Sequence, residues 1–305
     1  MLKKSLLLTV LLLIGHYAII KLYTPIEPGI ANLWDSNLIK AEKFIYDQGI
    51  EKDIIIVGSS LAAKLIEDSL PKRSANLALD GQSIYDGLEI LLQLKRKPKL
   101  LLIESNVIER KISESFINSL FSVVMYPARK KTNLLRTKNK PEYFADLAIE
   151  ETIVKPVCEK FINKLLYKIF NPISEYYANR EGKPDMALRE TMLEITKENI
   201  DNIILEKKYE KSVELLDKYI AHFSNLGTQI VFFEMPESTE LCNNSWANFR
   251  DTLVIDRYKS YNVHYSLNPN CAHYTTSDAV HLDKESATKF TKQIVNLIST
   301  FEITD

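Results

Sequence analysis

The stretch IIIVGSSLAAKL, from Ile54 to Leu65, decides the fold of this chain. Four apolar β-branched residues run directly into a glycine and two serines, and an apolar run without polar alternation is typical of a strand buried on both faces of a parallel sheet. The segment from Leu61 to Leu70 is then expected to be a helix. Ser59 and Ser60 therefore lie in a strand-to-helix turn, where a serine side chain can cap the helix or, given partners elsewhere, act chemically.

Four more short apolar runs are predicted to be strands, and helical patterns separate them. The strands lie within the stretches Ser74–Ser83, Lys99–Asn106, Thr228–Pro236 and Tyr261–Ser266, and two clear helical patterns are Tyr85–Lys95 and Lys284–Phe301. Strands that alternate with helices predict an α/β fold, with a parallel sheet covered by helices on both faces. In such sheets the reactive groups gather beyond the carboxyl ends of the strands.

The composition is that of an ordinary globular protein. The chain of 305 residues is 46% hydrophobic and 26% charged, and its formal net charge is -1. Acidic and basic residues are spread along the chain, so there is no electrostatic case for binding nucleic acid, and we expect no such partner.

The first residues predict a membrane anchor at residues 1–23. Lys3 and Lys4 precede sixteen uncharged, mostly apolar residues, and Lys21 follows them. A full span needs about 20 apolar residues, and lysines at the ends can snorkel to the interface. The leading lysines favour a cytoplasmic N-terminus, which predicts a single-pass membrane protein whose remaining chain faces the periplasm or exterior. The alternative is a cleaved signal peptide, although no convincing small-x-small site follows the apolar run.

Beyond the anchor, residues 24–50 are expected to form a linker and a helix, and residues 51–305 an α/β domain with a large helical insertion at residues 107–226. A long charged pattern from Met186 to Asn225 ends at Gly227, a residue type suited to a helix C-cap. The insertion also contains a basic stretch, Ala128 to Lys140. We interpret this stretch as a solvated loop, and a site for anionic glycan or lipid headgroups is the alternative.

The three cysteines are Cys158, Cys242 and Cys271, and their spacing fits neither a zinc site nor a CxxC pair. In an exported chain Cys242 and Cys271 could pair and leave Cys158 as a buried thiol. Free buried cysteines are the alternative, because a chain of this length can form a core without disulfides.

Near the C-terminus, Asp278 and His281 stand three residues apart in TTSDAVHLDKES. This spacing lets one short turn present both side chains on the same side. The aspartate can then hold the Nδ1–H of the imidazole while Nε2 faces a hydroxyl. The alternative is a turn aspartate next to a surface histidine.

Two further residues follow predicted strands and could stabilise an oxyanion. Gly81 can offer an unobstructed backbone N–H, and Asn106 can offer a side-chain amide. The backbone N–H of Ser60 at a helix N-terminus would be a third donor aimed at the same point. The structural alternative is that Gly81 only makes a turn and Asn106 only ends a strand.

At these residues the sequence resembles the SGNH hydrolases, also called GDSL-like esterases. Gly58-Ser59-Ser60-Leu61 resembles the nucleophile block, with Ser60 in the place of the nucleophile, and Asp278-Ala279-Val280-His281 resembles the terminal aspartate-x-x-histidine block. Gly81 and Asn106 stand in the glycine and asparagine blocks. The order of the blocks is that of the family, from about Asp53 to the end of the chain.

The sequence departs from the family pattern at three positions. Ser59 stands where the family has an aspartate before the serine, Glu104 where it has a glycine, and Val107 where it has an aspartate. The GSS variant resembles a membrane-anchored branch that modifies cell-envelope polymers, such as polysaccharide O-acetyl-transfer proteins and the D-alanyl-transfer proteins of teichoic acid assembly.

The resemblance implies a three-layer α/β/α sandwich and ester chemistry. Ser60 would be the nucleophile, His281 the base and then the acid, and Asp278 its orienting partner, with Ser60, Gly81 and Asn106 forming the oxyanion hole. Neither a metal nor an organic cofactor is expected.

The expected activity is that of a serine esterase or acyltransferase acting on O-acyl groups, acetyl foremost, of cell-envelope or extracellular polysaccharide. The expected partners are an acylated carbohydrate or other ester, the membrane and a membrane acyl-transfer protein. The alternative is a non-catalytic envelope scaffold or glycan-binding protein that keeps the fold.

Overall fold

The computed structural model describes residues 2–22, 32–47, 49, 51–140, 186–242 and 244–301. The chain forms two compact units, one from residues 1–47 and 118–178 and the other from residues 48–117 and 179–305. Residues 118–140, which fall within the predicted insertion at residues 107–226, belong to the first unit, and the predicted domain bounds stay a prediction.

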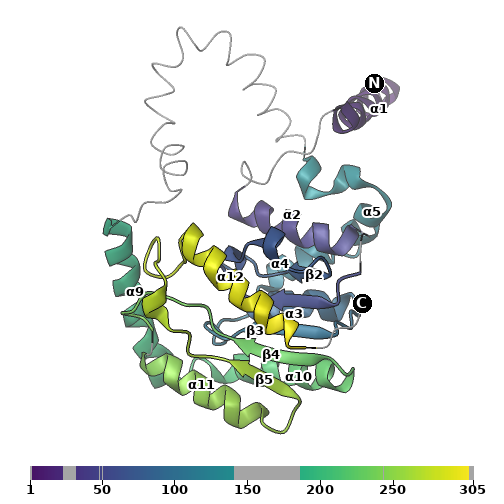
Figure 1. The fold of residues 1–305 in the computed structure, drawn as a ribbon. Helices are drawn as coiled ribbons and strands as arrows, with labels where there is room; N and C mark the ends of the chain where they lie inside the picture. The colour runs from purple at the N-terminus through teal and green to yellow at the C-terminus, as the bar shows by residue number, and fades with distance from the viewer. Residues whose placement is uncertain are drawn as a thin grey trace. The chain divides into compact units, whose positions relative to one another are not determined.

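The second unit contains a sheet of five parallel strands in the order β2-β1-β3-β4-β5 (Figure 1). The strands are β1 (Ile54–Val57), β2 (Ser74–Asn76), β3 (Leu100–Glu104), β4 (Gln229–Phe233) and β5 (Val263–Ser266). The predicted α/β fold with a parallel sheet is confirmed. This strand order is one of the common orders of doubly wound sheets, in which ligands bind beyond the carboxyl ends of the strands.

Helix α12 (Lys284–Ser299) covers one face of the sheet. Side chains alternate between the two faces along a strand, and Ile56 of β1 and Leu102 of β3 point to the α12 side. They form one buried cluster with Phe290 and Ile294 of α12. The Lys284–Phe301 pattern in the sequence therefore marks an amphipathic helix that packs on the core.

Helices α3 (Ile84–Gln93), α10 (Glu210–Asn225) and α11 (Ser245–Tyr258) belong to the opposite face. Gly87 of α3 lies so close to Val57 that an added Cβ would be 2.9 Å from the valine Cγ1. Tyr258 of α11 stacks on Phe232 of β4, with ring centroids 5.5 Å apart. Both faces of the sheet are thus covered, as the apolar strands predict.

The predicted helix at Leu61–Leu70 is wrong. Side chains from distant segments bind the backbone groups that a helix would use: Asn76 Nδ2 donates to the Ala62 carbonyl at 2.9 Å, and the N–H of Ile66 donates to Thr291 Oγ1 at 3.0 Å. The segment forms two short 3-10 turns instead, η2 (Ala62–Lys64) and η3 (Glu67–Ser69).

Two helices, α9 (Met186–Leu205) and α10, occupy the long charged pattern before β4. Gly227 ends α10 with a φ of 81°, and the N–H of Thr228 donates to the Phe223 carbonyl at 3.0 Å, so the predicted C-cap is confirmed. Helix α11 was not predicted. It begins after Asn244, whose side chain accepts a hydrogen bond from the N–H of Ala247 at 2.8 Å.

The helices outside the sheet-containing core are short apart from the first two. They are α1 (Leu2–Leu22), α2 (Leu33–Tyr46), α4 (Glu114–Leu120), α5 (Met125–Lys131) and the 3-10 turns η4 (Asn133–Leu135) and η5 (Thr137–Asn139). In the part of the chain that the structure describes, no helix meets the length and apolarity that a membrane crossing requires. The membrane anchor at residues 1–23 stays a prediction.

The basic stretch Ala128–Lys140 is not a solvated loop. Its Arg129 Nε lies 3.3 Å from a carboxylate oxygen of Glu42, a buried residue of α2. The other oxygen of Glu42 accepts the N–H of Thr137 at 2.7 Å, and Arg136 stacks over the ring of Tyr46 at 4.9 Å. These arginines therefore hold the first unit together.

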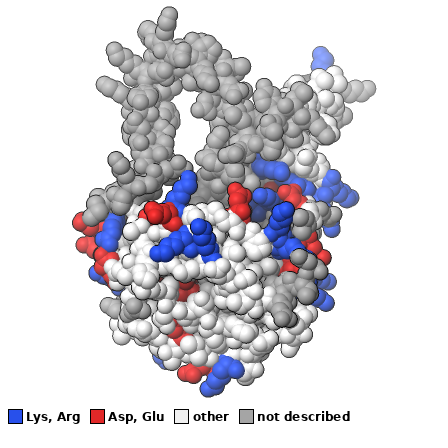
Figure 2. All heavy atoms as spheres, in the orientation of Figure 1, with Lys and Arg blue, Asp and Glu red and all other residues white. Residues whose placement is uncertain are grey.

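Charges of both signs are mixed on the surface that can be seen. Figure 2 shows lysine and arginine side chains interspersed with aspartate and glutamate over the face drawn in Figure 1. This mixture agrees with the net charge of -1.

Candidate active site

Three side chains form a continuous hydrogen-bonded chain in the second unit. Ser60 Oγ lies 2.8 Å from His281 Nε2, and His281 Nδ1 lies 2.7 Å from Asp278 Oδ2. Ser60 follows β1, whereas the other two residues stand in the turn between β5 and α12. The structure thus brings together the three residues that the sequence named as nucleophile, base and orienting acid.

The Asp278 carboxylate also shapes its own turn. Its Oδ1 accepts the backbone N–H of His281 at 2.7 Å and that of Val280 at 3.2 Å. Burial acts to raise the pKa of Asp278, but the hydrogen bonds and charge of His281 outweigh burial, so the pKa lies below its usual value. An ionised carboxylate therefore faces the imidazole Nδ1.

The turn is further constrained at Ala279, which is fully buried with a φ of 72°. The N–H of Ser238, in the loop after β4, donates to the Ala279 carbonyl at 2.9 Å. At the base of the turn, the N–H of Ser277 donates to the His281 carbonyl at 2.9 Å. The histidine is thus held by its backbone as well as by its ring.

Glu104, the last residue of β3, holds the turn that carries the nucleophile. Its Oε2 accepts the N–H of Ser59 at 2.8 Å and the N–H of Ala62 at 3.1 Å, and its Oε1 accepts the Ser59 hydroxyl at 2.8 Å. Ser59 Oγ in turn accepts the N–H of Leu61 at 3.2 Å. Ser59 is therefore a structural hydroxyl.

The glycine before the serines is required by space. A Cβ on Gly58 would lie 2.6 Å from the Ala62 Cβ and 2.6 Å from Glu104 Oε2, far inside contact distance. Burial raises the pKa of the Glu104 carboxyl, and the hydrogen bonds from Ser59 and Ala62 act in the opposite direction. The glutamate at position 104 thus has a structural role.

Two of the three predicted oxyanion donors are available. Neither the backbone N–H of Ser60 nor that of Gly81 donates to any residue that the structure describes. Gly81 has a φ of 70°, and its loop is tied to the nucleophile turn because the N–H of Leu79 donates to the Gly58 carbonyl at 3.2 Å. Ser60 does not begin an α-helix, so its N–H is not at the positive end of a helix dipole.

The third predicted donor, Asn106, is already occupied. Its Nδ2 donates to the Met235 carbonyl at 3.0 Å and to Glu237 Oε2 at 3.3 Å, and its Oδ1 accepts the N–H of Met235 at 2.8 Å. Both amide hydrogens therefore have partners in this state. Asn106 thereby connects the end of β3 to the segment after β4. Its amide can donate to an oxyanion only if the hydrogen bond to Glu237 is broken.

A buried arginine behind Asn106 was missed by the sequence reasoning. Arg250 of α11 is 1% exposed, and its NH2 nitrogen donates to Glu234 at 2.5 Å and to Asp251 at 2.9 Å. Burial raises the pKa of two nearby carboxyl groups, Glu109 and Glu237, to about 7. Arg250 was missed because α11 was not predicted.

Cys242 and Cys271 form a disulfide bond, so the pairing is confirmed over the alternative of free thiols. The bond joins the loop after β4 to the turn η7 (Cys271–His273), which precedes the Asp278 turn. Cys158 lies outside the described residues.

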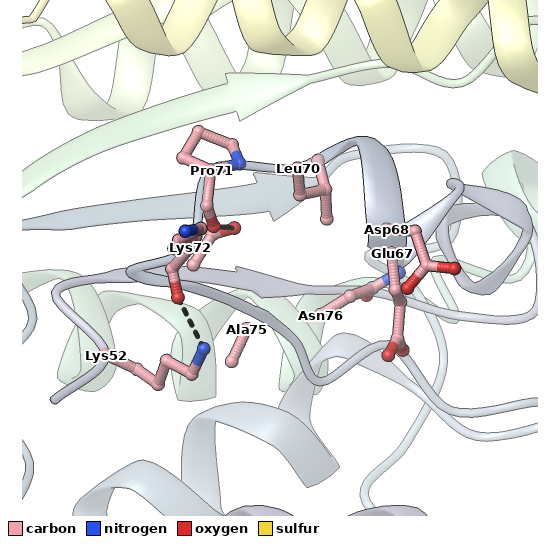
Figure 3. Close-up of a pocket in the computed structure, with 9 residues that line it drawn as sticks. Lys52, Glu67, Asp68, Leu70, Pro71, Lys72, Ala75 and Asn76 are labelled. Atoms are coloured by element: carbon pink, nitrogen blue, oxygen red, sulfur yellow. Dashed lines mark hydrogen bonds between the residues drawn. The ribbon is translucent and has the colours of Figure 1, made fainter. Parts of the chain in front are cut away.

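A surface pocket is lined by residues of β2, η3 and the loops beside them, and Ser60, His281 and Asp278 are not among its lining residues. Lys52 Nζ donates to the Lys72 carbonyl at 2.6 Å at its rim (Figure 3). The pocket is lined by Lys52, Glu67, Asp68, Leu70, Pro71, Lys72, Ser74, Ala75 and Asn76. None of these residues was predicted to act in the site.

Among the residues described, no three His, Cys, Asp or Glu side chains come together in a group that could hold a metal ion. No protein-family model matches the chain, and a search of curated proteins finds no match either. The arrangement of Ser60, His281 and Asp278 is therefore the main guide to its chemistry.

Proposed function

We propose that this protein is a serine esterase or O-acyltransferase that acts on O-acyl groups, acetyl foremost, of cell-envelope or extracellular polysaccharide. The observation that carries the proposal is the chain from Ser60 Oγ through His281 to Asp278, with distances of 2.8 Å and 2.7 Å. Such a chain activates a hydroxyl because the imidazole can accept its proton as a general base.

In the proposed reaction Ser60 Oγ attacks the carbonyl carbon of the ester, and its proton passes to His281 Nε2. Asp278 stabilises the imidazolium that forms. The N–H groups of Ser60 and Gly81 donate to the oxyanion. The tetrahedral intermediate then expels the alcohol, which takes the proton from His281, and leaves an acyl group on Ser60.

The second half of the reaction distinguishes the two activities. A water molecule or a sugar hydroxyl gives its proton to His281 and attacks the acyl carbon on Ser60. The bond to Ser60 Oγ then breaks, the serine oxygen takes the proton back from His281, and a carboxylic acid or a new sugar ester is released. Water as acceptor makes the protein a hydrolase, and a sugar as acceptor makes it a transferase. Comparing acetate release with acetyl transfer, with and without a sugar acceptor, separates the two.

The resemblance to the SGNH hydrolases supports ester chemistry on this fold. The hydrogen bonds of Glu104 to Ser59 also account for the departure from the family at these two positions. The doubly wound strand order and the position of Ser60 after β1 agree with a site beyond the carboxyl ends of the strands.

We propose an exported location with the N-terminus at the membrane. The Cys242–Cys271 disulfide suits an oxidising compartment, and the apolar side chains of α1, such as Leu8 and Leu12, are 59% and 65% exposed. A reporter fused after residue 50 is expected to be active only outside the cytoplasm. Activity confined to the cytoplasm would exclude this location.

A second candidate function is that of a non-catalytic scaffold or glycan-binding protein. One observation favours it, because Asn106 donates to Met235 and Glu237 and so leaves the oxyanion hole one donor short. This candidate predicts that the fold is stable but that Ser60 is unreactive.

Labelling with a fluorophosphonate separates the two candidates, because the probe reacts with an activated serine. The full chain in detergent is expected to be labelled and to hydrolyse an aryl acetate, and Ser60→Ala is expected to abolish both. The control is Ser299→Ala, which removes an exposed hydroxyl at the end of α12 and leaves the nucleophile turn unchanged. Equal turnover by wild type and Ser60→Ala, on an aryl ester and on an acetylated glycan, would remove the enzyme proposal.

A further inference from the structure

Glu237 is a half-buried carboxylate bound to a predicted oxyanion donor. It lies in the loop after β4, and its Oε2 accepts a hydrogen from Asn106 Nδ2 at 3.3 Å. The other amide hydrogen of Asn106 is held by the Met235 carbonyl at 3.0 Å. An amide nitrogen has two hydrogens, so the Glu237 bond takes the one that would otherwise be free.

The loop that carries Glu237 also contacts the turn of the histidine. The next residue, Ser238, donates its N–H to the Ala279 carbonyl at 2.9 Å, and Ala279 lies between Asp278 and His281. Glu237 therefore stands between the Asn106 amide and the Asp278 turn, at the same edge of the sheet as Ser60.

We propose that Glu237 is a positioning residue that controls the Asn106 oxyanion donor: its ionised carboxylate holds the amide away from the substrate, and its neutral form releases the amide. The inference rests on the proposed esterase or transferase function. A neutral acid accepts a weaker hydrogen bond than a carboxylate does. Protonation also removes a negative charge that would repel the developing oxyanion.

The charged groups around Glu237 come from three elements. Arg250 on α11 stabilises the ionised form, whereas Glu234 at the end of β4 and Glu104 at the end of β3 oppose it. Arg250 already donates to Glu234 and to Asp251, so it is shared among several carboxylates. Burial is the largest effect, and the pKa of Glu237 is raised to about 7.

The direction of the pH effect follows from these contacts. Below about pH 7 Glu237 is neutral, and the Asn106 amide hydrogen that it held can bind the oxyanion while the other hydrogen stays on the Met235 carbonyl. As the pH rises through 7, the carboxylate forms and binds the amide. Ester turnover in the wild type is therefore expected to decline above pH 7.

The test is Glu237→Gln, which keeps the shape and removes the charge. The decline above pH 7 is expected to disappear, and kcat for an aryl acetate at pH 8.5 is expected to rise about 10-fold, part of the effect of one oxyanion donor. The matched control is Glu240→Gln, which removes a carboxylate from the same loop that pairs with Arg189. This control is expected to leave the pH profile unchanged.

A Glu237→Gln profile that coincides with the wild-type profile overturns the inference. If that variant does not fold, as judged from its melting temperature, Glu237→Ala at this half-buried position is expected to show the same loss of the decline. Ser60→Ala measured in parallel keeps the two proposals apart. Turnover that depends on Ser60 but declines equally in all Glu237 variants rejects only the role of Glu237, whereas the absence of Ser60-dependent turnover rejects the proposed function.

Discussion

The carboxylate of Glu104 accepts hydrogen bonds from both the backbone N–H and the hydroxyl of Ser59, each at 2.8 Å. It thereby fixes the residue next to Ser60 from the end of a neighbouring strand. A carboxylate accepts from several donors at once and has no hydrogens of its own when ionised. This relationship lets β3 set the conformation of the loop after β1.

Glu104→Gln is therefore expected to disturb both stability and chemistry. The glutamine can keep its oxygen on the N–H groups of Ser59 and Ala62, but its NH2 group then faces the Ser59 hydroxyl, whose hydrogen loses its acceptor, and a buried donor left unpaired costs about 1–3 kcal/mol. We expect the free energy of unfolding in urea to fall by about 2 kcal/mol or more, and fluorophosphonate labelling of Ser60 to slow more than about 10-fold. The control is Glu214→Gln on the exposed side of α10. Wild-type labelling by Glu104→Gln would mean that the loop does not depend on this carboxylate.

Asn106→Ala is expected to have two separable effects. The free energy of unfolding should fall by about 1–3 kcal/mol, because the buried N–H and carbonyl of Met235 lose their partner. In addition, kcat measured below pH 7, where neutral Glu237 releases the amide, should fall about 100-fold. Urea denaturation and steady-state kinetics measure the two effects, and the exposed Asn248→Ala is the control. A stability loss without a loss of kcat would show that Asn106 acts only as a structural pin.

Ser60 and His281 are expected to act as one unit. Replacing either residue with alanine should abolish turnover, and the double variant should be little worse than either single variant, because both defects block the same step. Asp278→Asn should be less severe, since it leaves the nucleophile and the base in place. Steady-state kinetics on an aryl acetate measure these effects. Losses that multiply in the double variant would contradict a joint role.

Glu109→Gln is expected to stabilise the protein in a pH-dependent way. Burial raises the pKa of Glu109 to about 7 in the folded state, and its Oε2 has no hydrogen-bond partner among the described residues. A raised pKa contributes stability that is present at low pH and is lost as the pH rises through 7. At pH 8 the variant should exceed the wild type by about 1–3 kcal/mol, since one pKa unit corresponds to about 1.4 kcal/mol.

The advantage of Glu109→Gln should vanish near pH 4.5, and urea denaturation at both pH values measures it. Glu114→Gln, at an exposed position of α4, serves as the control. An equal difference at the two pH values would mean that the glutamine acts through packing and not through charge.

The basic stretch offers a comparison between arginines and lysines. Arg129→Gln removes the cation beside the buried Glu42 and should cost about 1–3 kcal/mol in thermal or urea unfolding. Lys130→Gln and Lys131→Gln change exposed side chains and should stay within about 0.5 kcal/mol of the wild type. Equal effects at all three positions would contradict the structural role of Arg129.

The sheet and the Asp278–His281 pair could be predicted because their signals are local, whereas Ser60, 221 residues before His281, was linked to them by the family resemblance. A buried parallel strand is an apolar run, and a histidine three residues after an aspartate can share its turn. The strands and the contacts of the three side chains agree with those patterns. The catalytic role of the three side chains stays a prediction.

The remaining features depend on partners that are distant in the sequence. The helical pattern at Leu61–Leu70 is overridden by Asn76 and Thr291, which take backbone groups that a helix would use. No local sequence pattern marks Glu237 or Arg250, because the pKa of each depends on the groups that the fold packs beside it. Secondary-structure propensity and residue spacing do not show which distant residues will contact each other.

The hydrogen bond between Ser60 and His281 joins residues that are 221 positions apart in the chain. At about 5–20 residues per second, a ribosome makes the histidine roughly 10–45 s after the serine. The serine therefore emerges without its base, and the nucleophile stays unactivated until the last turn and α12 have been synthesised and have docked on the sheet. A chain that crosses a membrane during this interval would do so before it could attack an ester.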